Sequence, residues 1–137
     1  MSNYFHMEMT TGEIATISNL GLAHLGDAVY ELMVRTWLIK SGKATANGLH
    51  RAAVNYVSAR AQAKAAASLL PHLTKDEQAV YRRGRNTHVK AVPQNATLEE
   101  YHAATGLEAL FGHLYLKGET ARISALFALT VGGQDAI

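Results

Sequence analysis

The spacing of hydrophobic residues predicts an all-helical protein. Apolar positions recur every three or four residues along almost the whole chain, and no β-branched run alternates with polar positions. Alanine, the strongest helix former, is abundant between residues 44 and 67. We therefore expect an all-α fold in a single domain over residues 1–137, with its core within about residues 18–130.

Capping residues and helix breakers divide this pattern into elements. The predicted helices cover about residues 19–40, 48–54, 58–70, 75–83, 97–117 and 119–130. Their starts are marked by side chains that cap helices: Ser18 or Asn19, Ser58, Thr74 with Glu77, and Thr97 with Glu100. Pro71 is expected to end the third helix, and residues 84–96 are expected to form an irregular loop.

The first long helix is apolar on most sides but carries one polar stripe. The stripe consists of His24, Asp27, Glu31 and Arg35, spaced three or four residues apart. One interpretation is an internal Glu31–Arg35 pair with Asp27 facing solvent; the other is that the carboxylates meet a ligand. Gly26 favours the second, because a glycine inside a helix costs about 1 kcal/mol and indicates a close neighbour.

A second isolated carboxylate lies on the predicted helix over residues 97–117. Glu108 stands there among alanine, leucine and phenylalanine, and Gly106 and Gly112 would allow another helix to approach closely. If the two helices cross near Asp27 and Glu108, their acids converge. Carboxylate oxygens suit magnesium or manganese better than zinc or copper.

Charge is segregated along the chain, although the net charge is only +2. Residues 32–98 carry eleven lysines and arginines against two acids, and the flanks carry nine acids against two basic residues. This pattern fits a polyanion partner beside a cation-binding carboxylate site; a lopsided surface with no ligand is the alternative. The chain has no cysteine, no apolar run long enough for a membrane span and no signal-like start, so we expect a soluble, cytoplasmic protein.

Several motifs in order resemble the ribonuclease III family. LGDAVYE at residues 25–31 is similar to the signature helix of its catalytic domain, and ATGLEALFGHLYL at 104–116 is similar to its other catalytic helix. NGLHRAAVNYVSARAQA at 47–63, RRGRN at 82–86 and PQNATLEEYHAATG at 93–106 resemble the short Mini-ribonuclease III branch, in which no double-stranded-RNA-binding domain follows. The resemblance covers roughly residues 18–130 and implies a ribonuclease III-like helical bundle.

The resemblance implies a magnesium-dependent endoribonuclease acting on double-stranded RNA, with manganese able to substitute. Asp27 and Glu108 match the family's catalytic metal ligands, and Glu31 matches a position that acts through a second shell or a water. Direct attack by water would leave 5′-phosphate and 3′-hydroxyl ends. Three positions where the larger enzymes carry acids hold Leu20, Ala23 and Thr105, which implies a reduced ligand set.

The basic middle of the chain then becomes a candidate RNA-binding surface, since duplex RNA is bound mainly through phosphates and 2′-hydroxyls. The leading contacts are Arg82, Arg83, Arg85, Asn86, His88 and Lys90. The alternative is a solvated charged loop without a ligand.

The resemblance also implies a homodimer and a role in maturation of the large-subunit (23S) ribosomal RNA precursor, with a large-subunit ribosomal protein as a further candidate partner. Tyr30, Trp37, Phe111 and Tyr115 are candidate interface residues, although aromatic residues more often pack in a core. The competing functions are a non-catalytic helical RNA-binding or ribosome-associated protein and a helical protein–protein interaction module.

Overall fold

The computed structural model describes residues 3–42, 45–87 and 95–132. The helices are α1 (Thr11–Ile14), α2 (Asn19–Lys40), α3 (Ala46–Val57), α4 (Ala59–Leu69), a 3₁₀ turn (Leu70–His72), α5 (Lys75–Arg85), α6 (Leu98–Leu116), α7 (Thr120–Phe127) and a π-helical turn (Ala128–Gly132). These described residues contain no strand, so the all-α prediction is confirmed. None of their helices combines the length and the apolar character that a membrane span requires.

The predicted helix starts are confirmed by their caps. The Ser18 hydroxyl accepts a hydrogen bond from the Gly21 amide at the start of α2, and α5 and α6 both begin with the predicted capping boxes. Two predictions were wrong in detail. A short helix, α1, begins at a further capping box that the sequence analysis overlooked, and α5 runs two residues into the segment expected to be a loop, because Gly84 packs against α6.

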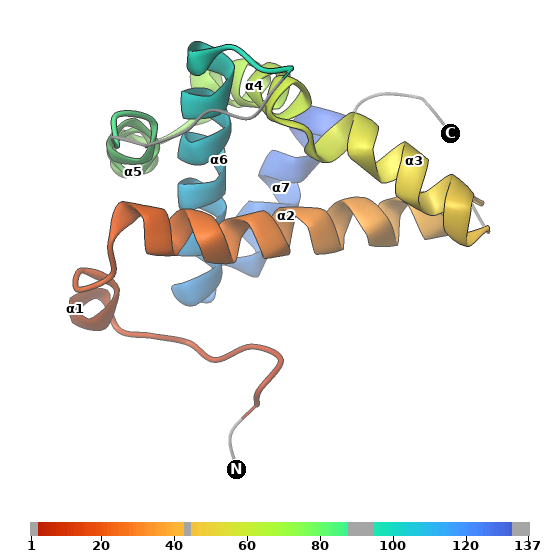
Figure 1. Ribbon diagram of the computed structural model, residues 1–137. Coiled ribbons are helices and arrows are strands. Elements are labelled where there is room, and N and C mark those ends of the chain that lie inside the picture. Colours follow the sequence, from red (N-terminus) through yellow and green to blue (C-terminus); the bar gives the residue numbers. More distant parts are fainter. Residues whose placement is uncertain (1–2, 43–44, 88–94, 133–137) are drawn as a thin grey trace.

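Helix α6 lies at the centre of the fold, and its neighbours pack around it. Helix α2 crosses it over a long contact, α4 and α5 pack against its N-terminal half, and α7 lies behind α2 (Figure 1). Tyr30 of α2 and Phe111 of α6 are both almost fully buried and meet edge to face with ring centroids 5.2 Å apart. These two aromatics therefore belong to the core and are not available for a dimer interface, which corrects the sequence prediction.

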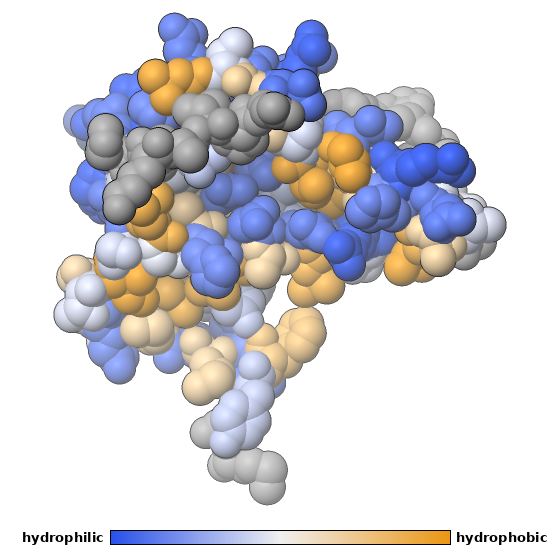
Figure 2. All heavy atoms as spheres, viewed as in Figure 1, coloured by the Kyte–Doolittle hydropathy of each residue, from blue (hydrophilic) through white to orange (hydrophobic). Residues whose placement is uncertain are grey.

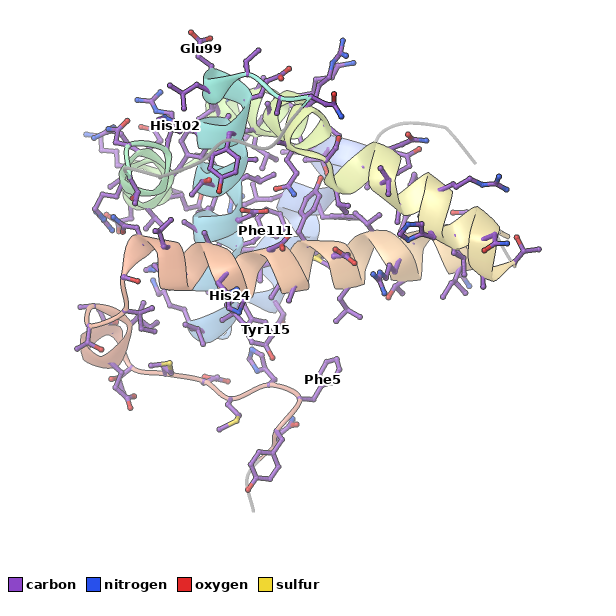
Figure 3. The ribbon with its side chains drawn as sticks, viewed as in Figure 1. Phe5, His24, Glu99, His102, Phe111 and Tyr115 are labelled. Atoms are coloured by element: carbon purple, nitrogen blue, oxygen red, sulfur yellow. The ribbon has the colours of Figure 1, made fainter. Side chains whose placement is uncertain are left out.

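The other two aromatics named for an interface are half-buried but also have partners within the chain. Trp37 stacks edge-on against Tyr56 of α3. Tyr115 packs against His6 and donates its hydroxyl proton to the Phe5 carbonyl, so it anchors the N-terminal segment to the end of α6 (Figure 3).

Two glycines allow α2 and α6 to cross backbone to backbone. A Cβ added at Gly26 would stand 1.6 Å from the Glu108 carbonyl oxygen, and one at Gly112 would stand 2.1 Å from the Leu22 carbonyl oxygen. The expectation that Gly26 marks a close neighbour is therefore confirmed. Gly106 serves a different contact, because it faces Tyr81 of α5.

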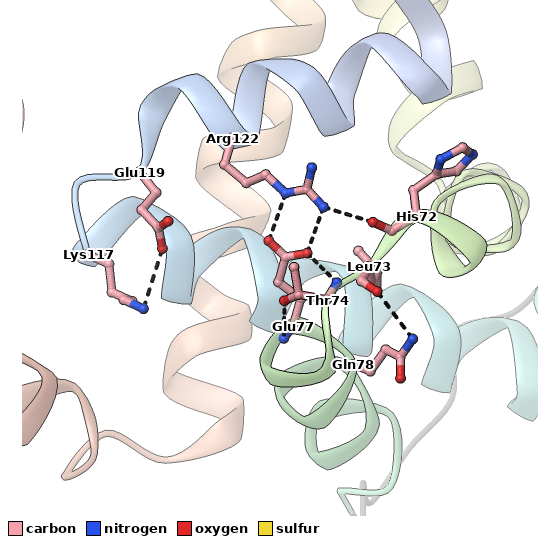
Figure 4. A network of polar contacts seen from close by, with 8 residues as sticks. All are labelled: His72, Leu73, Thr74, Glu77, Gln78, Lys117, Glu119 and Arg122. Carbon is pink, nitrogen blue, oxygen red and sulfur yellow. Dashed lines mark hydrogen bonds and ion pairs between the residues drawn. The ribbon is translucent and has the colours of Figure 1, made fainter.

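A polar network fastens the start of α5 to α7 (Figure 4). Arg122 donates two hydrogen bonds of 2.8 Å to the carboxylate of Glu77 and one of 2.9 Å to the His72 carbonyl. Hydrogen bonds from Arg122, and the capping bonds with Thr74, hold the pKa of Glu77 below its usual range despite its burial. The network fixes the helix whose opposite end carries Arg82, Arg83 and Arg85.

Candidate active site

The crossing of α2 and α6 brings two carboxyl groups together. Asp27 follows Gly26 on α2 and is exposed, and Glu108 lies half-buried on α6 at the point where Gly26 touches its carbonyl oxygen. The two carboxyl groups interact directly. Hydrophilic and hydrophobic side chains are intermixed on the face shown in Figure 2, and the exposed residues of α2 include Leu32 and Ile39 as well as Asp27. The convergence predicted from two separate sequence motifs is therefore present, and one of its members is open to solvent.

Burial and the facing carboxylate make Glu108 hard to ionise. Loss of solvent is the larger cause and the charge of Asp27 the second, and together they raise the pKa of Glu108 to about 8. Near neutral pH the Glu108 carboxyl therefore tends to keep its proton. A cation bound between the two carboxylates would offset this electrostatic cost, and its binding would displace the proton.

Glutamine 62 of α4 is the third side chain of the site, and the sequence analysis did not single it out. Its exposed fraction is 2%. Its Nε2 donates to the Val57 carbonyl at 2.9 Å and to Glu108 Oε2 at 3.2 Å. The bond to Glu108 opposes the rise in that residue's pKa, since it favours the ionised form.

The residues present fit a hard divalent cation. Asp27 and Glu108 supply carboxylate oxygens, and the buried Oε1 atom of Gln62 has no hydrogen-bond partner within the part of the chain that the structure describes. Among the described residues no group of three or more histidine, cysteine or acidic side chains is placed to hold a metal. Magnesium suits such a site, because it is commonly held by one or two carboxylates and keeps several waters.

The neighbouring candidates are engaged elsewhere. Glu31 forms an ion pair with Arg35 one turn along α2, as the first interpretation of the polar stripe required. Thr105, one turn before Glu108, is buried and donates its hydroxyl proton to the Tyr101 carbonyl. Figure 3 shows His24 on the side of α2 toward Tyr115 and the N-terminal segment. The direct carboxylate pair therefore consists of Asp27 and Glu108.

Comparison with known proteins identifies the family to which the chain belongs. A family model described as "Ribonuclease III domain" matches residues 20–119, which include both carboxylates. The chain belongs to the ribonuclease III family. It is accordingly an endoribonuclease of that family.

Relatives of similar length carry the name "Mini-ribonuclease 3". The protein from Symbiobacterium thermophilum is 50% identical over 109 residues, which are 80% of this chain and 84% of the relative. The one from a Thermoanaerobacter species is 39% identical over 125 residues, which are 90% and 88%. A crystal structure of a Fusobacterium nucleatum protein superposes with a TM-score of 0.81 at 29% identity, over 89% of this chain and 98% of that one.

The predicted RNA contacts of this ribonuclease III protein do not form one cluster. Arg82 and Arg85 line the same hollow beside Tyr81, whereas Arg83 lies in another hollow beside His113 and Lys117. Burial, then the charges of Lys117 and Arg83, lower the pKa of His113, and the charges of Glu119 and Asp76 oppose that shift.

Of the remaining predicted contacts, Asn86 lies within the described residues. Asn86 caps the C-terminal end of α5, accepts a hydrogen bond from the Arg85 side chain at 3.3 Å, and shares with it a hollow of about 530 Å³ between α4, α5 and α6. His88 and Lys90 lie outside the described residues. The basic side chains at the end of α5 thus project on two sides of that helix.

A sequence signal for Gln62 did exist in this ribonuclease III chain. The buried positions of α4 are Gln62, Ala65, Ala66 and Leu69, a three- and four-residue spacing that marks the inner face of a helix. A polar residue at the first position of an otherwise apolar stripe must find a partner in the interior. Its partner depends on how α4 packs against α6, which the spacing of apolar residues does not reveal.

Proposed function

We propose that this endoribonuclease cleaves double-stranded RNA and that Asp27 and Glu108 hold the Mg²⁺ ion it requires, with Mn²⁺ able to substitute. The single observation that carries the proposal is the buried Glu108 carboxyl facing a second carboxyl at the glycine crossing of α2 and α6. Two carboxylates placed together are destabilised unless a cation joins them.

Cation binding at this site depends on the protonation state of Glu108. Near neutral pH the Glu108 carboxyl must lose its proton before both acids can act as ligands, so cation binding releases a proton from Glu108. When bound, the ion supplies the Lewis-acid chemistry that acidifies water and neutralises charge on the scissile phosphate. Gln62 favours the ionised state of Glu108 throughout. No serine, cysteine or histidine nucleophile is needed, and the products would carry 5′-phosphate and 3′-hydroxyl ends.

The substrate proposal is supported by the basic end of α5. Arg82, Arg83, Arg85 and Asn86 are all exposed there, and duplex RNA is recognised largely through its phosphates and 2′-hydroxyls. We propose these four residues, with His88 and Lys90, as RNA contacts. Because most of this affinity would be electrostatic, we expect it to fall steeply with salt.

The cellular setting is the least specific part of the proposal and rests on family resemblance. It comprises a cytoplasmic homodimer that matures the 23S ribosomal RNA precursor, with a large-subunit ribosomal protein as a candidate partner. Glu31 remains a candidate contributor through water, although its pair with Arg35 must then open or be shared.

Cleavage of an end-labelled RNA duplex tests the proposal. We expect staggered products with Mg²⁺ or Mn²⁺ and none in EDTA, and a loss of at least about 1,000-fold in Asp27→Asn and Glu108→Gln. Asp76→Asn is the matched control, because Asp76 is an exposed carboxylate on α5. Binding of duplex without cleavage under all these conditions would instead identify a non-catalytic RNA-binding protein.

A further inference from the structure

Glutamine 62 makes a contact that its position in α4 does not require. Ser58 caps α4, and the Gln62 amide reaches back to the carbonyl of Val57, the residue before the cap. The same Nε2 atom also donates to Glu108 Oε2 on α6. The second bond joins two helices through residues 46 positions apart, and it ends on a carboxylate of the proposed metal site.

The protein contains an internal comparison for this arrangement. Gln78 occupies the equivalent position of α5, four residues after the Thr74 cap, and its Nε2 donates to the Leu73 carbonyl at 3.2 Å. Gln78 is only half-buried, and among the described residues its side chain makes that one hydrogen bond. The bond to the preceding carbonyl is therefore a local feature of a helix start, and the bond to Glu108 is the additional feature of Gln62.

The oxygen of the same amide is unsatisfied. Gln62 Oε1 is buried and has no hydrogen-bond partner among the described residues, although buried polar atoms are nearly always paired. Oε1 is a hydrogen-bond acceptor, so a hydrogen-bond donor such as a water molecule would satisfy it. Water molecules retained by a bound Mg²⁺ or Mn²⁺ are donors, and the amide that carries Oε1 is already bonded to one of the proposed ligands.

We propose that Gln62 is a positioning residue, which fixes the Glu108 carboxylate for a divalent cation and offers Oε1 to the hydration water of that cation. The inference rests on the metal site of the function proposed above. Occupation of Oε2 by the amide proton directs the other oxygen of Glu108 toward the ion. Residues that orient a ligand in this way typically change metal affinity tenfold to a hundredfold when replaced.

The test compares the same substitution at the two glutamines. Gln62→Met keeps the size of the side chain and removes the amide, and Gln78→Met removes only a helix-start bond. Calorimetric titration of the RNA-free proteins with Mn²⁺ should show affinity at least about tenfold weaker for Gln62→Met and unchanged for Gln78→Met. Gln62→Asn, which keeps the amide but withdraws it by one methylene, should show the same loss and provides a second variant should Gln62→Met fold poorly.

Kinetics of duplex cleavage give an independent readout. Because Gln62 is not one of the proposed RNA contacts, Gln62→Met should lower kcat at moderate Mn²⁺ with KM for RNA unchanged, and kcat should recover as Mn²⁺ is raised. Folded Gln62 variants with the Mn²⁺ affinity of wild type would overturn the positioning role while leaving the proposed function intact. A wild-type protein that binds no Mn²⁺ would overturn both the positioning role and the proposed metal site. The two failures are distinguishable, because the second is seen in the wild-type protein without any variant.

Discussion

Replacing Glu108 by glutamine should make the metal-free protein more stable at alkaline pH. The pKa of Glu108 is raised to about 8 from an ordinary value of 4.5, because the side chain is buried and faces Asp27. Ionisation therefore opposes folding: the penalty is absent below pH 4.5, grows as the pH rises toward 8 and is complete above 8. A glutamine of similar shape never carries this charge.

The size of the gain follows from the difference between the two pKa values. At about 1.4 kcal/mol per pH unit, the interval from 4.5 to about 8 gives an upper limit of about 5 kcal/mol. Solvent around the exposed Asp27 screens part of the repulsion, so we expect Glu108→Gln to gain about 2 kcal/mol at pH 9 and little at pH 5.

Urea unfolding in EDTA at pH 5, 7 and 9 measures this difference directly. Every other titrating group is common to both proteins, so the change in their stability difference with pH reports on residue 108 and its interaction with Asp27. Glu31→Gln is the control, because its carboxylate pairs with Arg35 and should not yield a gain. A stability difference that is the same at pH 5 and pH 9 would refute the reasoning, and so would a variant less stable than wild type at pH 9.

Three further substitutions test other parts of the structure. Gly26→Ala should cost at least about 3 kcal/mol by urea unfolding, because its Cβ would stand 1.6 Å from a backbone oxygen of α6. Gly12→Ala should cost little, because its Cβ would meet nothing nearer than 4.0 Å, and equal effects would contradict the close crossing. Arg122→Met should lower the free energy of unfolding by about 2 kcal/mol at pH 7. This loss should shrink in acid, because the pKa of Glu77 is lowered in the folded protein and its pair with Arg122 stops stabilising the fold as the pH falls; a loss independent of pH would contradict the ion pair. Arg85→Ala should weaken binding of all duplex sequences alike and reduce the salt slope by about one, and an unchanged slope in filter-binding assays would remove Arg85 from the RNA surface.

The local elements could be predicted from the sequence because their signals are local. Ser18 and the two capping boxes each lie within four residues of the amides they bind, so the starts of α2, α5 and α6 follow from short motifs. The end of α5 does not follow from a short motif, because it depends on how Gly84 packs against Ala109 of α6, a contact between distant segments.

The same distinction between local and distant contacts applies to the candidate site. Asp27 and Glu108 could be found because a carboxylate on an apolar helix is conspicuous, and Gly26 indicated that something approaches closely. The partners of Gln62 could not be predicted, because they depend on how α4 packs against α6. The separation of Arg83 from Arg85 was missed because residues 84–96 were expected to form a loop, whereas within α5 residues two positions apart lie on opposite sides of the helix. Periodicity identifies the inner face of a helix but not which neighbour it meets.

The contrast between two buried carboxylates gives the strongest physical reason to assign a cation to this site. Glu77 is buried and receives two hydrogen bonds from Arg122, so the chain neutralises that charge itself and the pKa falls. Glu108 is buried beside another acid, and the ion pairs among the described residues include none to it. A carboxylate that served only the fold would be paired as Glu77 is, because an uncompensated buried charge is strongly destabilising. The divalent cation proposed to be shared with Asp27 would supply the positive charge that no described residue brings to Glu108.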